Sequence, residues 1–313
     1  MTVIKDATDD EKLQVINLKE QLNSDDNKKY YRYLLLDMLG VTSELSNIYS
    51  QALKDSSPTS DIAIIKRPEL LHDLSSCPHL ICIGKPNQDI NEELLSSSIW
   101  QVEDDFLTTK QYVCGWIVSE KSTDELAKSL CDIGIKLGTL LSMRFIAFYE
   151  PFRLQLLQQS HPTAPNWLGS LFPTKTKYYY CDLQQTLQEI SAEDNWHFSQ
   201  LFFDHKISFF QKESVKLFKL YTLWHDIKQQ QKHTVNANEF TLMMSYYVSA
   251  CLLGLTHAED RAIFVFFAMQ YGDLLQSQHI KMIVEEVALN FPGELSMRFR
   301  EIDTQFPKLL KIA

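Results

Sequence analysis

The chain has 313 residues, of which 45% are hydrophobic, so it is long and apolar enough for one large or two ordinary domains with a sizeable core. Its 30 basic and 40 acidic residues give a formal net charge of −10, which argues against a general binder of nucleic acid or anionic membrane, because such a protein needs a basic face. The N-terminus lacks the features of a signal peptide and no apolar stretch is long enough to span a membrane, so we expect a cytoplasmic protein.

The motifs that mark many enzyme classes are absent from the sequence. Its nine glycines do not cluster, and there is no phosphate-binding glycine loop, paired-histidine zinc motif or nucleophile elbow. The six cysteines include no Cys-x-x-Cys pair, which favours reduced, buried thiols over a zinc site. The acidic trio at 103–105 can offer carboxylates to a metal, but such a run is more often a solvated turn. We therefore expect no catalytic residues, no metal and no cofactor.

Residues 1–29 are polar and charged, which predicts a mobile arm or a short surface helix. In residues 30–175, short apolar runs alternate with amphipathic stretches, which is typical of an α/β domain. The first predicted elements are a strand over Arg32–Met38, a helix over Val41–Leu53, a short strand or helix start over Ile62–Ile65, a strand over Leu80–Ile83 and a helix over Asn91–Ile99.

The clearest local signals begin at residue 112. The aromatic and β-branched run Tyr112–Val118 predicts a buried strand. Ser122 and Glu125 then form a capping-box pattern, because the hydroxyl and the carboxylate can each bond the other residue's amide. This pattern predicts a helix, and Gly138 is a plausible end for it.

A second strand is predicted over Met143–Tyr149, and Pro151 suits the first position of another helix. A strand–helix–strand connection of this length favours parallel pairing of its two strands. We therefore predict an α/β N-terminal lobe with a mainly parallel or mixed sheet, followed by an all-α C-terminal lobe.

Residues 176–313 are predicted to form the helical lobe, after one last strand-like piece over Lys177–Asp182. Apolar residues recur at helical spacing and capping patterns separate the segments, which indicates antiparallel helices with short loops. The predicted helices are Lys206–Gln230, 236–253, 256–272, Gln278–Leu289 and Glu294–Phe306.

A few polar and aromatic side chains stand out as candidate functional residues. Asp37 ends the first strand, where it either faces a ligand or caps the following turn. Arg144 lies in an apolar run and needs a partner if it is buried, for which Glu150 and Asp37 are candidates. Trp116 and Tyr149 belong to the core by default, although such aromatics also anchor protein interfaces.

The order of these landmarks resembles the adaptor, or effector-chaperone, proteins of bacterial type VI secretion systems. That family opens on a strand similar to residues 33–37, and its later landmarks are a Pro-x-Leu-Ile strand and a Gly-Trp-x-x-Ser strand before a capped helix. Its hallmark is a segment close to Arg-Phe-Tyr-Asp-Pro, followed by a Leu-rich helix and a Leu-Gly turn. Here these read Pro78-His79-Leu80-Ile81, Gly115-Trp116-Ile117-Val118-Ser119, Ala147-Phe148-Tyr149-Glu150-Pro151 and Trp167-Leu168-Gly169. The hallmark arginine is thus replaced by Ala147, with Arg144 nearby, and the hallmark aspartate by Glu150.

The resemblance implies a non-catalytic chaperone that binds a toxin effector in the cytoplasm, often through the N-terminal segment of the effector. It further implies delivery of this cargo to the spike protein of the secretion apparatus, without nucleic acid or membrane as a partner. The side chains that we expect to bind cargo are Asp37, Trp116, Arg144, Phe148, Tyr149, Glu150 and Pro151.

Two other classes of function stay open at the level of sequence. One is a divergent hydrolase that uses Asp37, Glu150 or the acidic trio. The other is an immunity-type protein that blocks a toxin, since an acidic surface suits a basic, nucleic-acid-cleaving partner.

Overall fold

A computed structural model describes residues 17–40, 48–55, 61–107, 110–159, 167–192 and 205–302. The expectations for the arm before residue 17, the start of the helix at Val41 and the end of the last helix lie outside these residues. The chain divides into two compact units, Met1–Ser214 and Val215–Ala313, and each is described by itself. No described helix is both long and apolar enough to cross a lipid bilayer.

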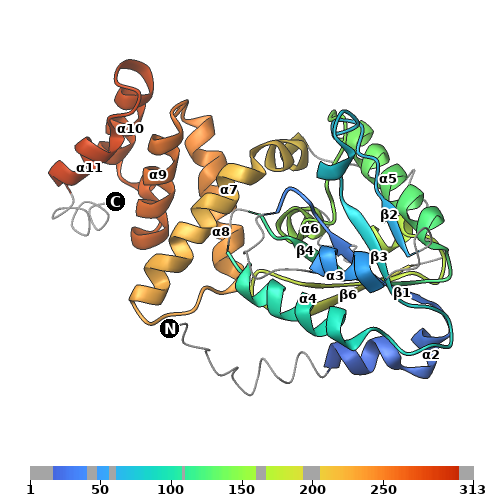
Figure 1. Cartoon of the computed structure of the whole chain (residues 1–313). Helices are drawn as coiled ribbons and strands as arrows, with labels where there is room; N and C mark the ends of the chain where they lie inside the picture. The colour runs from blue at the N-terminus through green and yellow to red at the C-terminus, as the bar shows by residue number, and fades with distance from the viewer. Residues whose placement is uncertain are drawn as a thin grey trace. The chain divides into compact units, whose positions relative to one another are not determined.

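The first unit is built on a six-stranded sheet in the order β2-β3-β1-β4-β5-β6 (Figure 1). Every neighbouring pair in this sheet is antiparallel. The strands are β1 (Tyr31–Leu36), β2 (Ile62–Ile64), β3 (His79–Gly84), β4 (Val113–Ser119), β5 (Lys177–Cys181) and β6 (Leu187–Ser191).

The prediction of a mainly parallel or mixed sheet is therefore wrong, and so is the fold class built on it. The helix α3 (Ile48–Asp55) connects β1 to β2, and α4 (Glu92–Asp104) connects β3 to β4. Each connection joins strands that run in the same direction, but another strand lies between them and pairs antiparallel with both. The strand spacing along the chain cannot reveal this insertion. Helices also occur along the whole chain and are not confined to its C-terminal part.

The strand predicted over Met143–Tyr149 is a second error. This segment follows α5 (Thr123–Leu140) and has no regular secondary structure. The amides of Met143 and Ile146 donate to the Gly138 and Gly134 carbonyls at 2.8 and 3.0 Å, so the segment folds back along α5. Its apolar side chains are buried there rather than in the sheet, which is why the apolar run is indistinguishable from a buried strand in the sequence.

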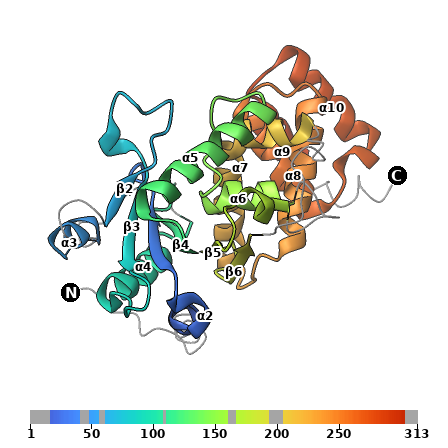
Figure 2. The same cartoon turned by 90° about the vertical axis from the view of Figure 1, so that its right-hand side faces the viewer.

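Helices cover both faces of the sheet, as Figures 1 and 2 show. One face packs with α5, α6 (Pro151–Gln158), the 145–149 segment and the short helix η2 (Trp167–Leu171) in one hydrophobic cluster. The other face packs with α3 and α4 in a second cluster. Both faces are thus apolar, which explains why β1 and β4 lack the alternation of a half-exposed strand. The short helices α2 (Asp25–Lys28) and η1 (Leu74–Ser76) also belong to this unit, and residues 17–23 are helical.

The second unit is helical and has its own core. The helix α7 (His205–Gln230) begins in the first unit and continues into the second. The further helices are α8 (Ala237–Leu252), α9 (Ala258–Tyr271), η4 (Leu274–Gln276), α10 (Gln278–Asn290) and α11 (Leu295–Ile302). Buried side chains of α8 to α11, such as Phe264, Val284 and Phe299, form one cluster.

Asp260 joins two of these helices. It lies in the first turn of α9 and is 1% exposed. Its carboxylate accepts hydrogen bonds from the amides of Gly293 and Leu295, at 2.6 and 3.0 Å. Asp260 therefore caps α11 from a different helix.

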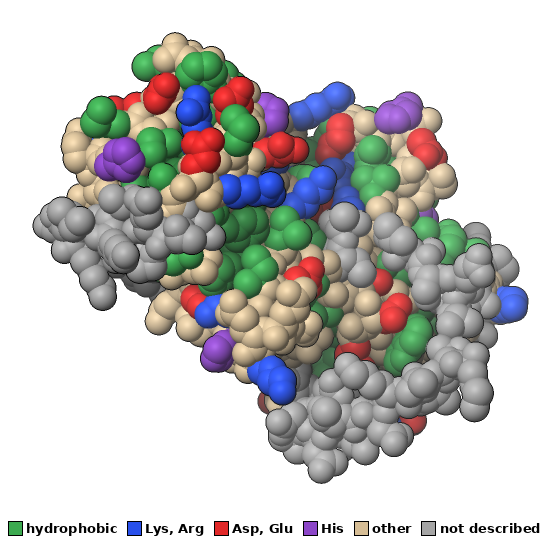
Figure 3. Space-filling view, turned by 90° about the vertical axis from the view of Figure 1, so that its left-hand side faces the viewer, with side chains coloured by type: hydrophobic (Ala, Val, Ile, Leu, Met, Phe, Trp, Pro, Cys, Tyr) green, Lys and Arg blue, Asp and Glu red, His purple; other side chains and the backbone are tan. Residues whose placement is uncertain are grey.

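Some apolar side chains of this unit stay at the surface. Leu252 and Leu289 are 83% and 80% exposed. On the face that Figure 3 presents, hydrophobic side chains lie in small groups among acidic and basic ones. Scattered exposure of this kind is normal for a soluble surface and does not by itself mark an interface.

Candidate functional site: a partly buried charge network

Asp37 lies directly after β1 and is fully buried. Its Oδ1 accepts a hydrogen bond from the Leu39 amide at 3.0 Å, and its own amide donates to the Tyr112 carbonyl at 2.8 Å. The side chain thus caps the turn that follows the strand, which is one of the two roles expected for it. Burial raises the pKa of Asp37, and the nearby ammonium of Lys110 opposes this effect.

Lys110 joins two carboxylates from distant parts of the chain. Its Nζ lies 3.0 Å from Asp37 Oδ2 and 3.2 Å from Glu150 Oε1. Burial by itself lowers the pKa of Lys110, but Glu150 and Asp37 outweigh it, so that the pKa is raised overall. The lysine is therefore held as a cation between two acids.

Glu150 also binds Arg153, three residues further along. Arg153 Nε donates to Glu150 Oε2 at 2.9 Å, so both carboxylate oxygens of Glu150 have a cationic partner. The Arg153 guanidinium also donates to the Gln211 carbonyl at 3.0 Å, and the Gln211 side-chain amide donates to the Arg153 carbonyl at 3.1 Å. We call Asp37, Lys110, Glu150 and Arg153 the Lys110 network. It ties the end of β1 and the start of α6 to the beginning of α7.

A third cation, Arg67, contacts the Tyr149 side chain. Arg67 donates to the Tyr149 hydroxyl at 3.0 Å and forms an ion pair with Glu69 at 2.6 Å. The guanidinium also lies over the Phe145 ring, 5.1 Å from its centroid. Burial raises the pKa of Tyr149 well above its ordinary value, so its hydroxyl is a neutral hydrogen-bonding group at physiological pH.

Cys114 is a buried cysteine on which the charges of Asp37, Glu150 and Lys110 act. It lies in β4 at a register shift opposite Leu35 and Leu36, where the strand contains an extra residue. The thiol is buried, and burial raises its pKa well above the ordinary value. A neutral thiol is a poor nucleophile, so this environment does not activate the cysteine.

Asp105, the last residue of the acidic trio at 103–105, has a structural role. Asp105 is 3% exposed and accepts from the Tyr112 amide at 2.9 Å and from the Gln101 side chain at 2.6 Å. Burial raises the pKa of Asp105. Among the described residues, no group of three or more His, Cys, Asp or Glu side chains is arranged to hold a metal ion.

The structure brings together some of the predicted cargo-binding residues and separates others. Asp37 and Glu150 meet through Lys110, whereas Arg144 is exposed and pairs with neither of them among the described residues. Arg144 was expected to need a partner only if it is buried, and that condition is not met; Lys110 and Arg153 are the cations that pair with the two acids. Trp116, Phe148, Tyr149 and Pro151 are buried in the core.

These positions limit how the predicted residues can act. Trp116 donates from its indole nitrogen to Ser98 Oγ at 2.9 Å, inside the protein. Buried side chains of this kind can only position a binding surface, whereas Arg144 and the 20% exposed Glu150 side chain can touch a partner directly. Cargo binding by the whole set stays a prediction.

Sequence reasoning missed four polar residues of this region: Lys110, Arg153, Arg67 and Gln211. Only Arg153 has a local signal, because an acid–base pair three residues apart at the start of a helix is a recognisable pattern. Lys110 and Gln211 meet their partners across long sequence separations, which no spacing rule reveals.

Both carboxylates of the Lys110 network have partners inside the protein. Glu150 has both oxygens in ion pairs and Asp37 accepts from an amide and faces Lys110, so neither carboxylate is poised as a general base. Comparison of the chain with protein-family models, with curated proteins and with solved structures gave no match in any of the three.

Proposed function

We propose that this protein is a non-catalytic cytoplasmic adaptor, which binds a type VI secretion effector and helps to load it onto the spike protein. The observation that carries the proposal is the position of the segment that resembles the family hallmark, residues 147–151. Four of its five residues are buried, and the fifth, Glu150, forms ion pairs with Lys110 and Arg153 in the Lys110 network. The segment therefore contributes both to the core of the first unit and to its charge network, as expected of the defining segment of a family.

The link from this segment to α7 supports a role with two partners. Through Arg153 and Gln211 the segment is bonded to the first turns of α7, and α7 continues into the second compact unit. An adaptor has to hold a cargo and a spike protein, and two units with separate cores offer two separate surfaces for them. The ion pairs of the Lys110 network are consistent with this role, because they engage both carboxylates of the network, those of Asp37 and Glu150.

We assign the cargo to the first unit, near Arg144 and Glu150. Replacement of both residues, as R144A with E150Q, is expected to weaken cargo binding at least tenfold while the protein stays folded. The matched control is Lys128→Ala, since Lys128 is an exposed residue of α5 with no ion pair among the described residues. An unchanged affinity in the folded double variant would place the cargo elsewhere.

The first experiment is co-expression of the protein with the products of the genes beside its own, followed by affinity purification and sizing by light scattering. A stable complex with a large toxin-like neighbour, with a spike protein or with both is the expected result. A protein that neutralises a toxin but binds no spike protein would instead be an immunity protein. Elution of the protein alone would contradict the adaptor proposal.

A further inference from the structure

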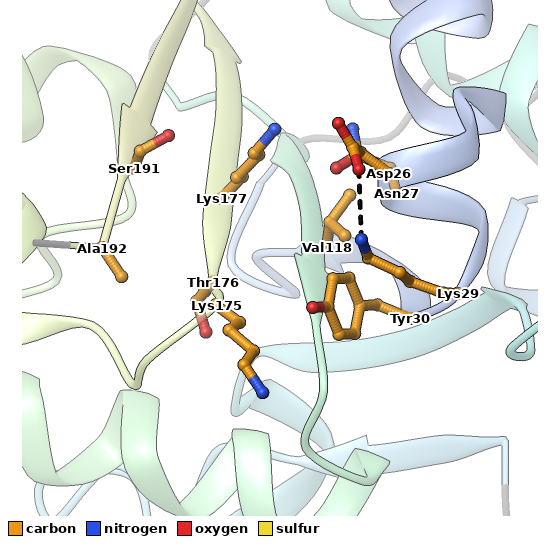
Figure 4. Close-up of a pocket in the computed structure, with 10 residues that line it drawn as sticks. All are labelled: Asp26, Asn27, Lys29, Tyr30, Val118, Lys175, Thr176, Lys177, Ser191 and Ala192. Carbon is orange, nitrogen blue, oxygen red and sulfur yellow. Dashed lines mark hydrogen bonds and ion pairs between the residues drawn. The ribbon is translucent and has the colours of Figure 1, made fainter.

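A pocket opens between α2 and the first residues of β5, on the face of the sheet opposite α5 (Figure 4). Its volume is about 300 Å³, which lies at the lower end of the range for small-molecule sites. Asn27 of α2 is buried and donates to the Tyr179 hydroxyl at 3.2 Å, so the helix that forms one wall is bonded to the strand that forms the other.

The pocket is basic in a chain that is acidic as a whole. Among the described residues, Lys29, Lys175 and Lys177 line it together with a single carboxylate, that of Asp26. Lys29 pairs with Asp26 at 3.1 Å and Lys175 pairs with Glu120 at 2.9 Å. Both pairs are largely exposed, so they contribute little to stability and can rearrange around a ligand.

Lys177 differs from the other two lysines. It is the first residue of β5 and is only partly exposed. It lies on the same face of the strand as Tyr179, because side chains two residues apart share a face. No ion pair reaches it from any residue that the structure describes. Its positive charge is therefore available to an anion in the pocket.

Hydroxyl groups supply neutral donors beside these cations. The Tyr30 hydroxyl points towards the start of β5 (Figure 4) and has no hydrogen-bond partner among the described residues. Thr176 is 1% exposed, and its Oγ1 lies 3.0 Å from Ser119 Oγ. Only one of these two hydroxyl protons is needed for the bond between them, so the second can be donated to a ligand.

We propose that this pocket binds the phosphate group of a small molecule. A phosphate presents several acceptor oxygens in different directions and carries up to two negative charges. Ammonium and hydroxyl donors line this pocket from the residues that follow α2, Lys29 and Tyr30, and from residues 175–177 at the start of β5. A carboxylate is planar and is matched best by the fork of an arginine, and the described residues that line the pocket include lysines but no arginine. This proposal is independent of the adaptor function.

The test is isothermal titration of the full-length protein with pyrophosphate and with inorganic phosphate, at constant ionic strength set with potassium chloride. Citrate is the comparison anion, because it carries similar charge on carboxylates alone. We expect both phosphates to bind the wild type at millimolar concentrations or below, and citrate to bind more weakly. Constant ionic strength matters because salt screens exposed charges.

Variants locate the site. Lys177→Gln is expected to weaken pyrophosphate binding about tenfold or more, since it removes a charged donor, whereas Lys128→Gln on the exposed face of α5 leaves binding unchanged. Tyr30→Phe keeps the ring and removes only the hydroxyl, so it is a second test if Lys177→Gln folds poorly.

Three results would overturn the proposal. These are no binding of either phosphate to the wild type, equal binding to wild type and both pocket variants, and citrate binding as tight as pyrophosphate binding. The first two would remove the site, and the third would reassign it to carboxylates.

Discussion

Lys110 is the residue that joins the two carboxylates of the charge network, the fully buried one of Asp37 and the partly buried one of Glu150. Its ammonium is the cation that faces Asp37 and one of the two that bind Glu150. Removing one partner of a buried ion pair costs more than the pair itself contributes, because the remaining charge is left without compensation. The effect at this residue should therefore be larger than for any of the exposed pairs of the first unit.

Lys110→Met is expected to lower the free energy of unfolding by about 1–3 kcal/mol. The Asp37 carboxylate is fully buried and keeps only its bond from the Leu39 amide in this variant. Urea denaturation measures the change, with Lys128→Met as the matched control at an exposed lysine. A change as small as in the control would show that the network does not stabilise the fold.

The contribution of Lys110 should also depend on pH in a defined direction. Its pKa in the folded protein is raised above the ordinary value of 10.5, so the folded state holds the proton more tightly than the unfolded state. The stabilisation is complete below pH 10.5 and is lost as the pH rises through the higher folded value. The stability difference between wild type and Lys110→Met should therefore be constant near neutral pH and shrink at higher pH. A difference that grows with alkaline pH would contradict the assignment.

At the level of elements, the bulge in β4 depends on one glycine. Gly115 has a φ of 154°, and a Cβ there would lie 2.3 Å from the Tyr179 carbonyl oxygen and 2.7 Å from Tyr178 Cε2. Tyr178 in turn places its hydroxyl 2.8 and 3.0 Å from the carbonyl oxygens of Cys114 and Tyr149. The glycine thus lets β5 approach β4 and fixes the core beneath the hallmark segment.

Gly115→Ala is expected to destabilise the protein by at least about 3 kcal/mol, because backbone strain and steric overlap add. Gly272→Ala is the matched control, since Gly272 also has a positive φ, 90°, but nothing lies within 4 Å of an added Cβ. Its cost should be that of the backbone alone, about 1–2 kcal/mol. Thermal unfolding of both variants separates the two contributions, and equal costs would mean that β5 moves aside.

At the level of the whole molecule, the two compact units have separate cores, and in each unit a buried acid joins segments that are far apart in the sequence. Asp37 does so in the first unit and Asp260 in the second. Proteins often open in cooperative regions that follow such units. Breaking the contacts of Asp37 should then loosen mainly the first unit, and breaking the contacts of Asp260 should loosen mainly the second.

Hydrogen exchange measured by mass spectrometry tests this division. Asp260→Ala leaves two amides at the start of α11 without their acceptor, so exchange should quicken in α9 and α11 and stay unchanged in β1 and β4. Lys110→Met should give the reverse pattern. Faster exchange throughout both units in either variant would show that the chain opens as one cooperative structure.

Local features of this protein follow from its sequence alone. The helix α5 begins at the predicted capping box, where the Glu125 carboxylate accepts from the Ser122 amide at 3.0 Å. The helix α6 begins at Pro151, and the strand predicted from Arg32 appears as β1. Such features depend on residues a few positions apart, so pattern and propensity suffice to predict them.

Only the tertiary structure decided the features that join distant residues. In the sheet, β3 lies between β1 and β2, and β1 lies between β3 and β4, so the strands joined by helices are not neighbours. The 143–149 segment is buried against α5 instead of pairing as a strand. Asp37 and Glu150 were considered in the sequence only as alternative partners of Arg144, whereas in the structure Lys110 joins the two acids. An apolar run specifies burial but not its partner, and a charge specifies a need for compensation but not which charge supplies it; both are settled by packing of the whole chain.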